Sequence, residues 1–125
     1  LVSPAKVGQN WRYTYLNVHR DGVTHGSELF NAIACFDRET GKMAIADLGE
    51  NCYPSEPILV PSQNNPEQGW LLTVVFDGNT NSSEVRIYQS DRLSAAPICR
   101  LALPSVIPPG FHGTWKSNTK SDWLK

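Results

Sequence analysis

The chain has 125 residues, of which 40% are hydrophobic and 18% are charged, and its formal net charge is -1. This composition is that of an ordinary globular domain, large enough to bury one core. Because lysine and arginine are scattered rather than clustered, no basic patch favours nucleic acid or an anionic membrane surface as a partner. No apolar run reaches the length of a membrane span and no signal-peptide pattern opens the chain, so we expect neither.

Short segments rich in aromatic and β-branched residues alternate with turn residues, and no window shows a sustained helical period. This pattern predicts an all-β protein with little helix. The predicted strands are residues 11–18, 29–36, 43–48, 56–61, 70–76, 84–89 and 97–103. The connection at 37–42 has the glycine that a hairpin needs, and residues 49–55 and 62–69 are predicted to be loops. Prolines bound the strand at 56–61, which favours an edge or an inner rim of a sheet, and Thr73 interrupts the otherwise apolar strand at 70–76.

Turn and aromatic residues recur along the chain at offsets of 55 to 59 residues. Gln9-Asn10-Trp11 recurs as Gln68-Gly69-Trp70, and Asp21-Gly22 recurs as Asp77-Gly78. Units of three to four antiparallel strands at about this period are typical of propeller blades. We therefore predict one all-β unit with blade-like repeats at about 9–55 and 56–104, the alternative being a chance match among common turn residues.

Three cysteines, Cys35, Cys52 and Cys99, stand at wide and unrelated spacings. No C-x-x-C pair indicates zinc or a redox couple. We expect reduced thiols in a cytoplasmic protein, with Cys35 and Cys99 acting as small hydrophobes in apolar segments.

The stretch L-P-S-V-I-P-P-G-F-H-G-T-W-K at residues 103–116 is rich in proline and glycine. Pro108 and Pro109 fix the backbone, and Gly110 and Gly113 flank Phe111-His112, so the sequence predicts a stiff irregular segment that presents one imidazole. From this stretch alone two readings stay open: a metal-binding histidine, and a surface coil whose histidine only forms hydrogen bonds.

Five segments resemble, in sequence and in order, the C-terminal part of the carotenoid cleavage oxygenases, a family that includes lignostilbene dioxygenases and the retinal-pigment-epithelium retinoid isomerase. The segments are residues 36–42, 56–61, 69–77, 83–84 and 110–115. The resemblance implies about two C-terminal blades of a seven-bladed antiparallel β-propeller. It also implies an Fe(II) ion on the propeller axis, held by four histidines and supported by glutamates.

Position by position, His112 matches the last of the iron-binding histidines and Glu56 matches one supporting glutamate, with 105–116 as the metal-ligand segment. Such a glutamate accepts the second ring N–H of the histidine and so fixes its tautomer. Without the family, Glu56 reads as a strand-start carboxylate that caps backbone N–H groups. His19 and His25 match no ligand and are expected at the surface.

The activity that the resemblance implies is oxidative cleavage, with O2, of a C=C double bond in an apolar carotenoid, apocarotenoid or stilbene-like molecule. The family's proteins are several times longer and three of the four histidines have no match, so we expect this chain alone to bind no stoichiometric iron. The alternative is a truncated, inactive relative that acts as a binding or self-assembly module through exposed β edges. In either case apolar strands without neighbours predict a homo-oligomer.

Overall fold

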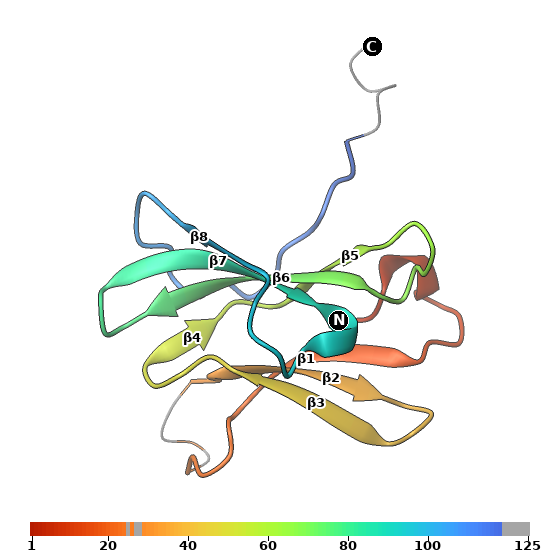
Figure 1. Cartoon of the computed structure of the whole chain (residues 1–125), viewed down its shortest axis with the longest axis horizontal. Helices are drawn as coiled ribbons and strands as arrows, with labels where there is room; N and C mark the ends of the chain where they lie inside the picture. Colours follow the sequence, from red (N-terminus) through yellow and green to blue (C-terminus); the bar gives the residue numbers. More distant parts are fainter. Residues whose placement is uncertain (25, 27–28, 119–125) are drawn as a thin grey trace.

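A computed structural model, which describes residues 1–24, 26 and 29–118, shows two antiparallel β-sheets joined by loops (Figure 1). The first sheet has the order β1-β2-β3, with β1 at Tyr13–Val18, β2 at Ala32–Asp37 and β3 at Lys42–Asp47. The second contains β4 (Cys52–Pro54), β5 (Ile58–Pro61), β6 (Gly69–Asp77), β7 (Ser82–Gln89) and β8 (Cys99–Ala102). Two short 3-10 helices, η1 (Pro4–Lys6) and η2 (Ser90–Arg92), complete the described elements. The prediction of an all-β fold is confirmed.

β4 and β5 lie along the same edge of β6, as two pieces of one interrupted strand. Pro54 at the end of β4 pairs with Val75, and Ile58 at the start of β5 pairs with Leu72. Between them, residues 55–57 are not part of a strand, although the N–H of Ser55 still donates to the carbonyl of Val74 on β6. The sequence predicts a loop at 49–55. This prediction is wrong for residues 52–54, which form the edge strand β4, where a proline at the end of the strand is tolerated. The second sheet is therefore four strands wide, with β6 and β7 inside it.

The β2–β3 and β6–β7 hairpins have turns of the same design. In each, an aspartate side chain accepts the backbone N–H two positions later, at 3.0 Å for Asp37 and 2.8 Å for Asp77. Gly41 and Asn81 end the two turns with positive φ angles of 68° and 49°. These two similar turns lie 40 residues apart, whereas the repeats were matched at offsets of 55 to 59 residues. The boundaries of the two predicted repeats stay a prediction.

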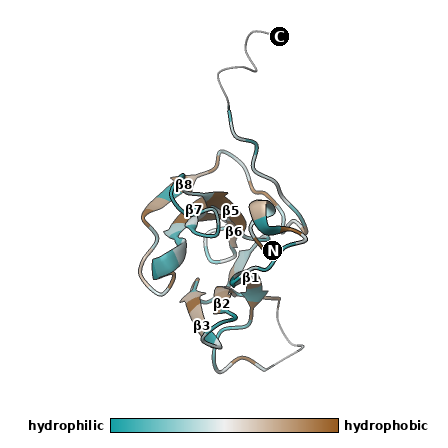
Figure 2. Cartoon of the chain, turned by 90° about the vertical axis from the view of Figure 1, so that its right-hand side faces the viewer, coloured by the Kyte–Doolittle hydropathy of each residue, from teal (hydrophilic) through white to brown (hydrophobic). Residues whose placement is uncertain are grey.

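One apolar core lies between the two sheets. Its members are Tyr15, Ile33, Cys35, Ala46 and Leu48 from the first sheet and its end, and Cys52, Leu59, Leu71, Val75, Tyr88 and Leu93 from the second sheet and its flank. Figure 2 shows the two sheets edge-on as separate layers with apolar strands in each. All three cysteines are free thiols, and burial raises the pKa of Cys35 to about 11, so that thiol stays protonated at neutral pH.

A buried arginine connects the sheets. Arg86, on β7, is 7% exposed and donates from Nη1 to the carbonyl oxygen of Leu48 at 3.0 Å. Its Nε donates to Glu84 at 2.6 Å, and Arg100 donates to the same carboxylate at 2.7 Å. Burial opposes ionisation of Glu84, but the hydrogen bonds from Arg100 and Arg86 hold its pKa below the ordinary value. The buried charge is therefore paired, as a low-dielectric interior requires.

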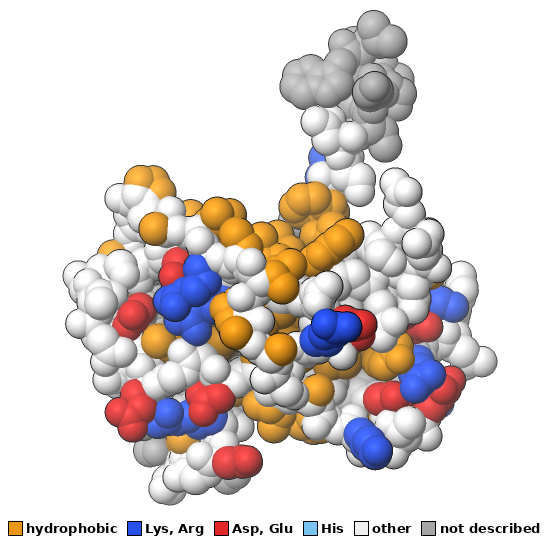
Figure 3. All heavy atoms as spheres, in the orientation of Figure 1, with side chains coloured by type: hydrophobic (Ala, Val, Ile, Leu, Met, Phe, Trp, Pro, Cys, Tyr) orange, Lys and Arg blue, Asp and Glu red, His pale blue; other side chains and the backbone are white. Residues whose placement is uncertain are grey.

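Large apolar side chains remain exposed outside this core. Met43, Trp70, Ile98 and Leu101 are each about half exposed. Figure 3 shows hydrophobic side chains gathered across the middle of one face, with charged side chains toward its two sides. In the described part of the chain, no helix has both the length and the apolar character needed to span a bilayer.

Candidate metal centre

Glu56 lies at the edge of the second sheet, in the interruption between β4 and β5. The residue before it, Ser55, is held by its N–H, which donates to the carbonyl of Val74 at 2.8 Å, and by its C=O, which accepts from Thr73 Oγ1 at 2.8 Å. The residue after it, Pro57, is buried. Glu56 therefore projects from a backbone fixed on both sides, and its side chain is 27% exposed.

Residues 103–116, here called the C-terminal segment, contain no helix or strand and cross the second sheet on specific hydrogen bonds. The N–H of Leu103 donates to the carbonyl of Ser83 at 2.9 Å, and Ser83 Oγ accepts the N–H of Ile107 at 2.9 Å. Further along, the N–H of Gly110 donates to Ser55 Oγ at 3.1 Å. The segment is irregular and anchored, as its prolines and glycines predict.

The C-terminal segment brings His112 to Glu56. His112 Nδ1 lies 3.1 Å from Glu56 Oε2, although the two residues are 56 positions apart in the chain. If the carboxylate accepts from Nδ1–H, the neutral imidazole keeps its lone pair on Nε2, which is the arrangement that suits a metal ligand held by a carboxylate. The imidazole is 88% exposed, so Nε2 is accessible from outside this chain.

Gly113 lets the C-terminal segment lie close to β5 directly after the histidine. A Cβ atom at this position would lie 2.7 Å from Ile58 Cδ1 and 3.3 Å from Cγ1. A side chain here would displace the isoleucine or lift the segment. The absence of a side chain at Gly113 thus allows close contact between the C-terminal segment and Ile58.

The residues present fit one part of an iron site. A neutral imidazole nitrogen is a suitable ligand for Fe(II), and the carboxylate behind it supplies the orientation. Among the described residues, no group of three or more histidine, cysteine, aspartate or glutamate side chains could hold a metal ion. The four-histidine site that the family resemblance implies therefore needs ligands in addition to those that the described residues bring together.

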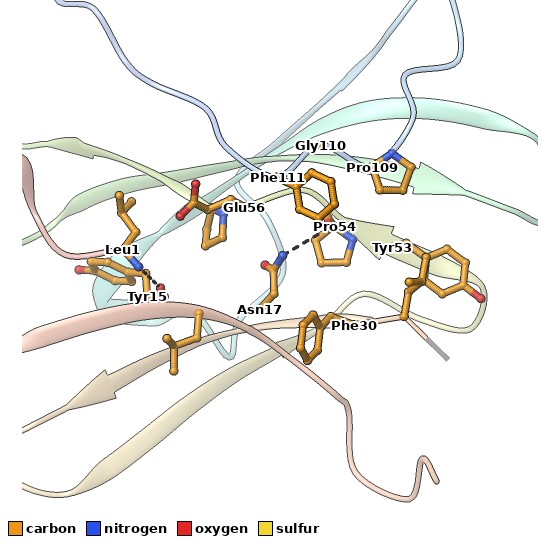
Figure 4. A pocket seen from close by; sticks show the side chains of 13 residues that line it. Leu1, Tyr15, Asn17, Phe30, Tyr53, Pro54, Glu56, Pro109, Gly110 and Phe111 are labelled. Carbon is orange, nitrogen blue, oxygen red and sulfur yellow. Dashed lines mark hydrogen bonds between the residues drawn. The ribbon is translucent and has the colours of Figure 1, made fainter. Parts of the chain in front are cut away.

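A pocket of about 500 Å³ opens beside Glu56, between β1, β4 and the C-terminal segment. Figure 4 shows Phe111 and Pro54 on one side of it and Phe30 on the other. Asn17 contributes an amide to the wall, with Nδ2 3.5 Å from the carbonyl of Pro54 and Oδ1 buried without a hydrogen-bond partner among the described residues. The pocket is thus mainly apolar, with few polar groups.

Several contacts of this site carry no recognisable signal in the sequence. Ser55, Thr73 and Ser83 act through hydroxyl and carbonyl groups whose partners depend on the strand register. His19 was expected at the surface but is half-buried, with its ring centroid 4.9 Å from that of Phe30. His25 lies outside the described residues.

Comparison with known proteins decides the family. The model of the family described as retinal pigment epithelial membrane protein matches residues 1–117. The chain belongs to this family, the carotenoid cleavage oxygenases. It is 29% identical to the apocarotenoid-15,15'-oxygenase of Synechocystis over 92% of this chain and 24% of that protein. It is 36% identical to a carotenoid 9,10(9',10')-cleavage dioxygenase of Pisum sativum over 89% of this chain and 23% of that protein.

Solved carotenoid cleavage oxygenase structures have the same fold. A cobalt-substituted crystal structure of the Synechocystis apocarotenoid oxygenase superposes with a TM-score of 0.81 at 30% identity, over 94% of this chain and 24% of that one. A lignostilbene dioxygenase of Pseudomonas brassicacearum gives a TM-score of 0.85 at 18% identity, over 94% and 26%, which supports the fold alone. The sheets of this chain are therefore β-propeller blades, and the chain spans about a quarter of the length of these relatives.

Proposed function

We propose that this chain supplies one iron ligand, His112, and its orienting carboxylate, Glu56, to a non-haem Fe(II) dioxygenase that cleaves a C=C double bond. The observation that carries the proposal is the 3.1 Å distance from His112 Nδ1 to Glu56 Oε2. The names of the relatives, which include a resveratrol cleavage oxygenase of Aspergillus fumigatus, point to carotenoid, apocarotenoid or stilbene-like substrates.

In this role each residue has one task. His112 binds as a neutral imidazole through Nε2, and Glu56 keeps the proton on Nδ1 and holds the ring plane. Fe(II), when bound, supplies the redox chemistry by which O2 splits an electron-rich alkene into two carbonyl compounds. The other ligands come from parts of the propeller outside the described residues.

The pocket beside Glu56 fits an apolar substrate. Its volume of about 500 Å³ lies within the range of small-molecule sites, and Leu16, Phe30 and Phe111 are among its lining residues. The pocket opens next to Glu56, the carboxylate that orients His112. A molecule held in the pocket would therefore lie near the proposed iron ligand.

A chimaera tests the proposal. Residues 1–117 of this chain would replace the matching segment of the Synechocystis apocarotenoid-15,15'-oxygenase. His112→Ala should abolish iron binding and apocarotenoid cleavage together. Glu56→Gln should keep the fold and weaken metal binding by about ten- to a hundredfold. Thr114→Ala, in the same segment, is the control and should change neither; cleavage that survives His112→Ala would refute the proposal.

A second candidate is a binding or self-assembly module without oxygenase chemistry. The half-exposed Trp70, Ile98 and Leu101 favour it, because apolar surface of this kind is suited to partner contacts. A chimaera that folds and binds iron but cleaves nothing, whereas the parent enzyme is active, would support this second candidate.

A further inference from the structure

A single hydroxyl interrupts the inward-facing side of β6. The three buried positions there are Leu71, Thr73 and Val75, each at most 1% exposed. Valine at the middle position would have nearly the same shape and an equal preference for a strand, without a polar group to satisfy. The threonine hydroxyl therefore needs a structural reason, and the structure supplies one.

Thr73 Oγ1 donates to the carbonyl of Ser55 at 2.8 Å. Ser55 is the first residue after β4: its N–H still donates to the carbonyl of Val74 on β6, but strand pairing along this edge resumes only at Ile58. The carbonyl of Ser55 accepts this hydrogen bond from the Thr73 side chain. In a continuous strand, a backbone N–H of β6 would donate it instead. The hydroxyl thus fixes the peptide that leads directly into Glu56.

Ser55 also reaches the other half of the metal centre. Its own hydroxyl oxygen accepts the N–H of Gly110 at 3.1 Å, two residues before His112. One residue therefore touches both partners of the histidine–carboxylate pair: it is bonded to Glu56 along the chain and hydrogen-bonded to the segment that carries the imidazole.

We propose that Thr73 and Ser55 are positioning residues that keep Glu56 and His112 in register. Thr73 fixes the Ser55 carbonyl, and the Ser55 hydroxyl fixes Gly110, so the carboxylate and the imidazole meet at hydrogen-bond distance. The purpose of this arrangement, orienting a metal ligand, rests on the proposed function. The arrangement itself can be measured without metal, since the hydrogen bond from Nδ1 determines which tautomer of His112 is populated.

The experiment measures the tautomer of His112 by 1H–15N NMR in the whole 125-residue chain at alkaline pH, where the imidazole is neutral. The wild type should show mainly the Nδ1–H form. Glu56→Gln should lower the ratio of Nδ1–H to Nε2–H by about fivefold, because an amide donates as well as accepts and no longer selects one tautomer. Thr73→Val should lower the ratio to a similar extent, whereas Thr73→Ser, which keeps the hydroxyl, should retain the wild-type ratio.

Two further variants separate positioning from general stability. Val75→Ala removes apolar contacts from the same face of the same strand, so it should lower the melting temperature and leave the tautomer ratio unchanged. Ser55→Ala removes only the bond to Gly110 and should lower the ratio, which keeps the proposal testable if Thr73→Val fails to fold. A wild-type ratio in Thr73→Val or, should that variant not fold, in Ser55→Ala overturns the inference while the proposed function stands. A ratio that Glu56→Gln does not alter overturns both.

Discussion

Ser83 Oγ lies 2.9 Å from the amide nitrogen of Ile107 and 3.2 Å from its carbonyl oxygen, so one hydroxyl both accepts from and donates to a residue 24 positions away. This reciprocal pair ties the start of the C-terminal segment to β7. It lies just ahead of Pro108 and Pro109, where the backbone has no N–H to donate. The path to His112 therefore depends on this serine.

Ser83→Ala should loosen that path without unfolding the sheet. Losing a hydrogen bond worth about 0.5 to 1.5 kcal/mol should make amide hydrogen exchange at Ile107 about two- to tenfold faster. The amide of Leu103 is an internal control, because it donates to the backbone carbonyl of Ser83, which alanine keeps. Equal acceleration at both amides would mean that the whole segment detaches.

The 125-residue chain, purified with added Fe(II), should contain no stoichiometric iron. Its described residues offer His112 but no group of three or more ligating side chains, and one histidine competes poorly with water for Fe(II). Elemental analysis after dialysis is the measurement. One tightly held iron per monomeric chain would contradict this prediction, whereas iron shared by several chains would show that they pool their histidines.

The folded chain should lose stability in acid partly through Glu84. The pKa of Glu84 is lower in the folded state than its ordinary value, so its stabilising contribution is complete above the ordinary pKa and disappears as the pH falls through the folded one. The hydrogen bond from Arg12 lowers the pKa of Asp37 in the same direction. Urea unfolding at about pH 7 and about pH 3 should therefore give a smaller free energy of unfolding in acid.

Glu84→Gln isolates this contribution. The variant leaves the buried Arg86 without its carboxylate, so the free energy of unfolding at neutral pH should fall by about 3 kcal/mol. The difference between the two pH values should also become smaller than in the wild type. An unchanged pH dependence would assign the acid sensitivity to other carboxylates.

The isolated chain should self-associate at micromolar concentration. Trp70 on β6, Ile98 just before β8 and Leu101 on β8 are 41%, 54% and 50% exposed, and uncovered apolar surface of this kind drives association. Light scattering should give a mass above the 13.9 kDa of one chain, and Leu101→Lys should lower it. A wild-type monomer with a cooperative melt would show that the two sheets already cover enough of their apolar faces.

Much of the fold follows from local sequence patterns. Dense aromatic and β-branched residues placed most strands within two or three residues of their observed ends, because burial on one or two faces of a sheet leaves that pattern. β4 escaped prediction because Cys52, Tyr53 and Pro54 are too few to show alternation and lie next to turn residues. The likeness of the two hairpin turns has a local signal, because each begins with an aspartate, Asp37 or Asp77, whose side chain accepts the backbone N–H two positions later.

The contacts of the candidate metal centre follow less directly from local sequence patterns. Glu56 and His112 could be paired only through the family resemblance, because nothing in the spacing of two residues 56 positions apart indicates contact. Thr73 was visible as a break in an apolar strand, but its partner follows from the interruption between β4 and β5, which depends on register across β6. Sequence patterns report burial well, whereas single hydrogen bonds between distant loops depend on the assembled sheet.

Arg86 places a guanidinium from one blade against the carbonyl of Leu48 at the end of the other. If the sheets separated, this charge would lose its buried partners while the shared core of Tyr15, Leu71 and Val75 became hydrated. Because the Arg86–Leu48 hydrogen bond and the apolar core are shared by the two sheets, opening of either sheet exposes these groups to water. The two blades should behave as a single cooperative folding unit, with amide protection in β2 and β6 lost together.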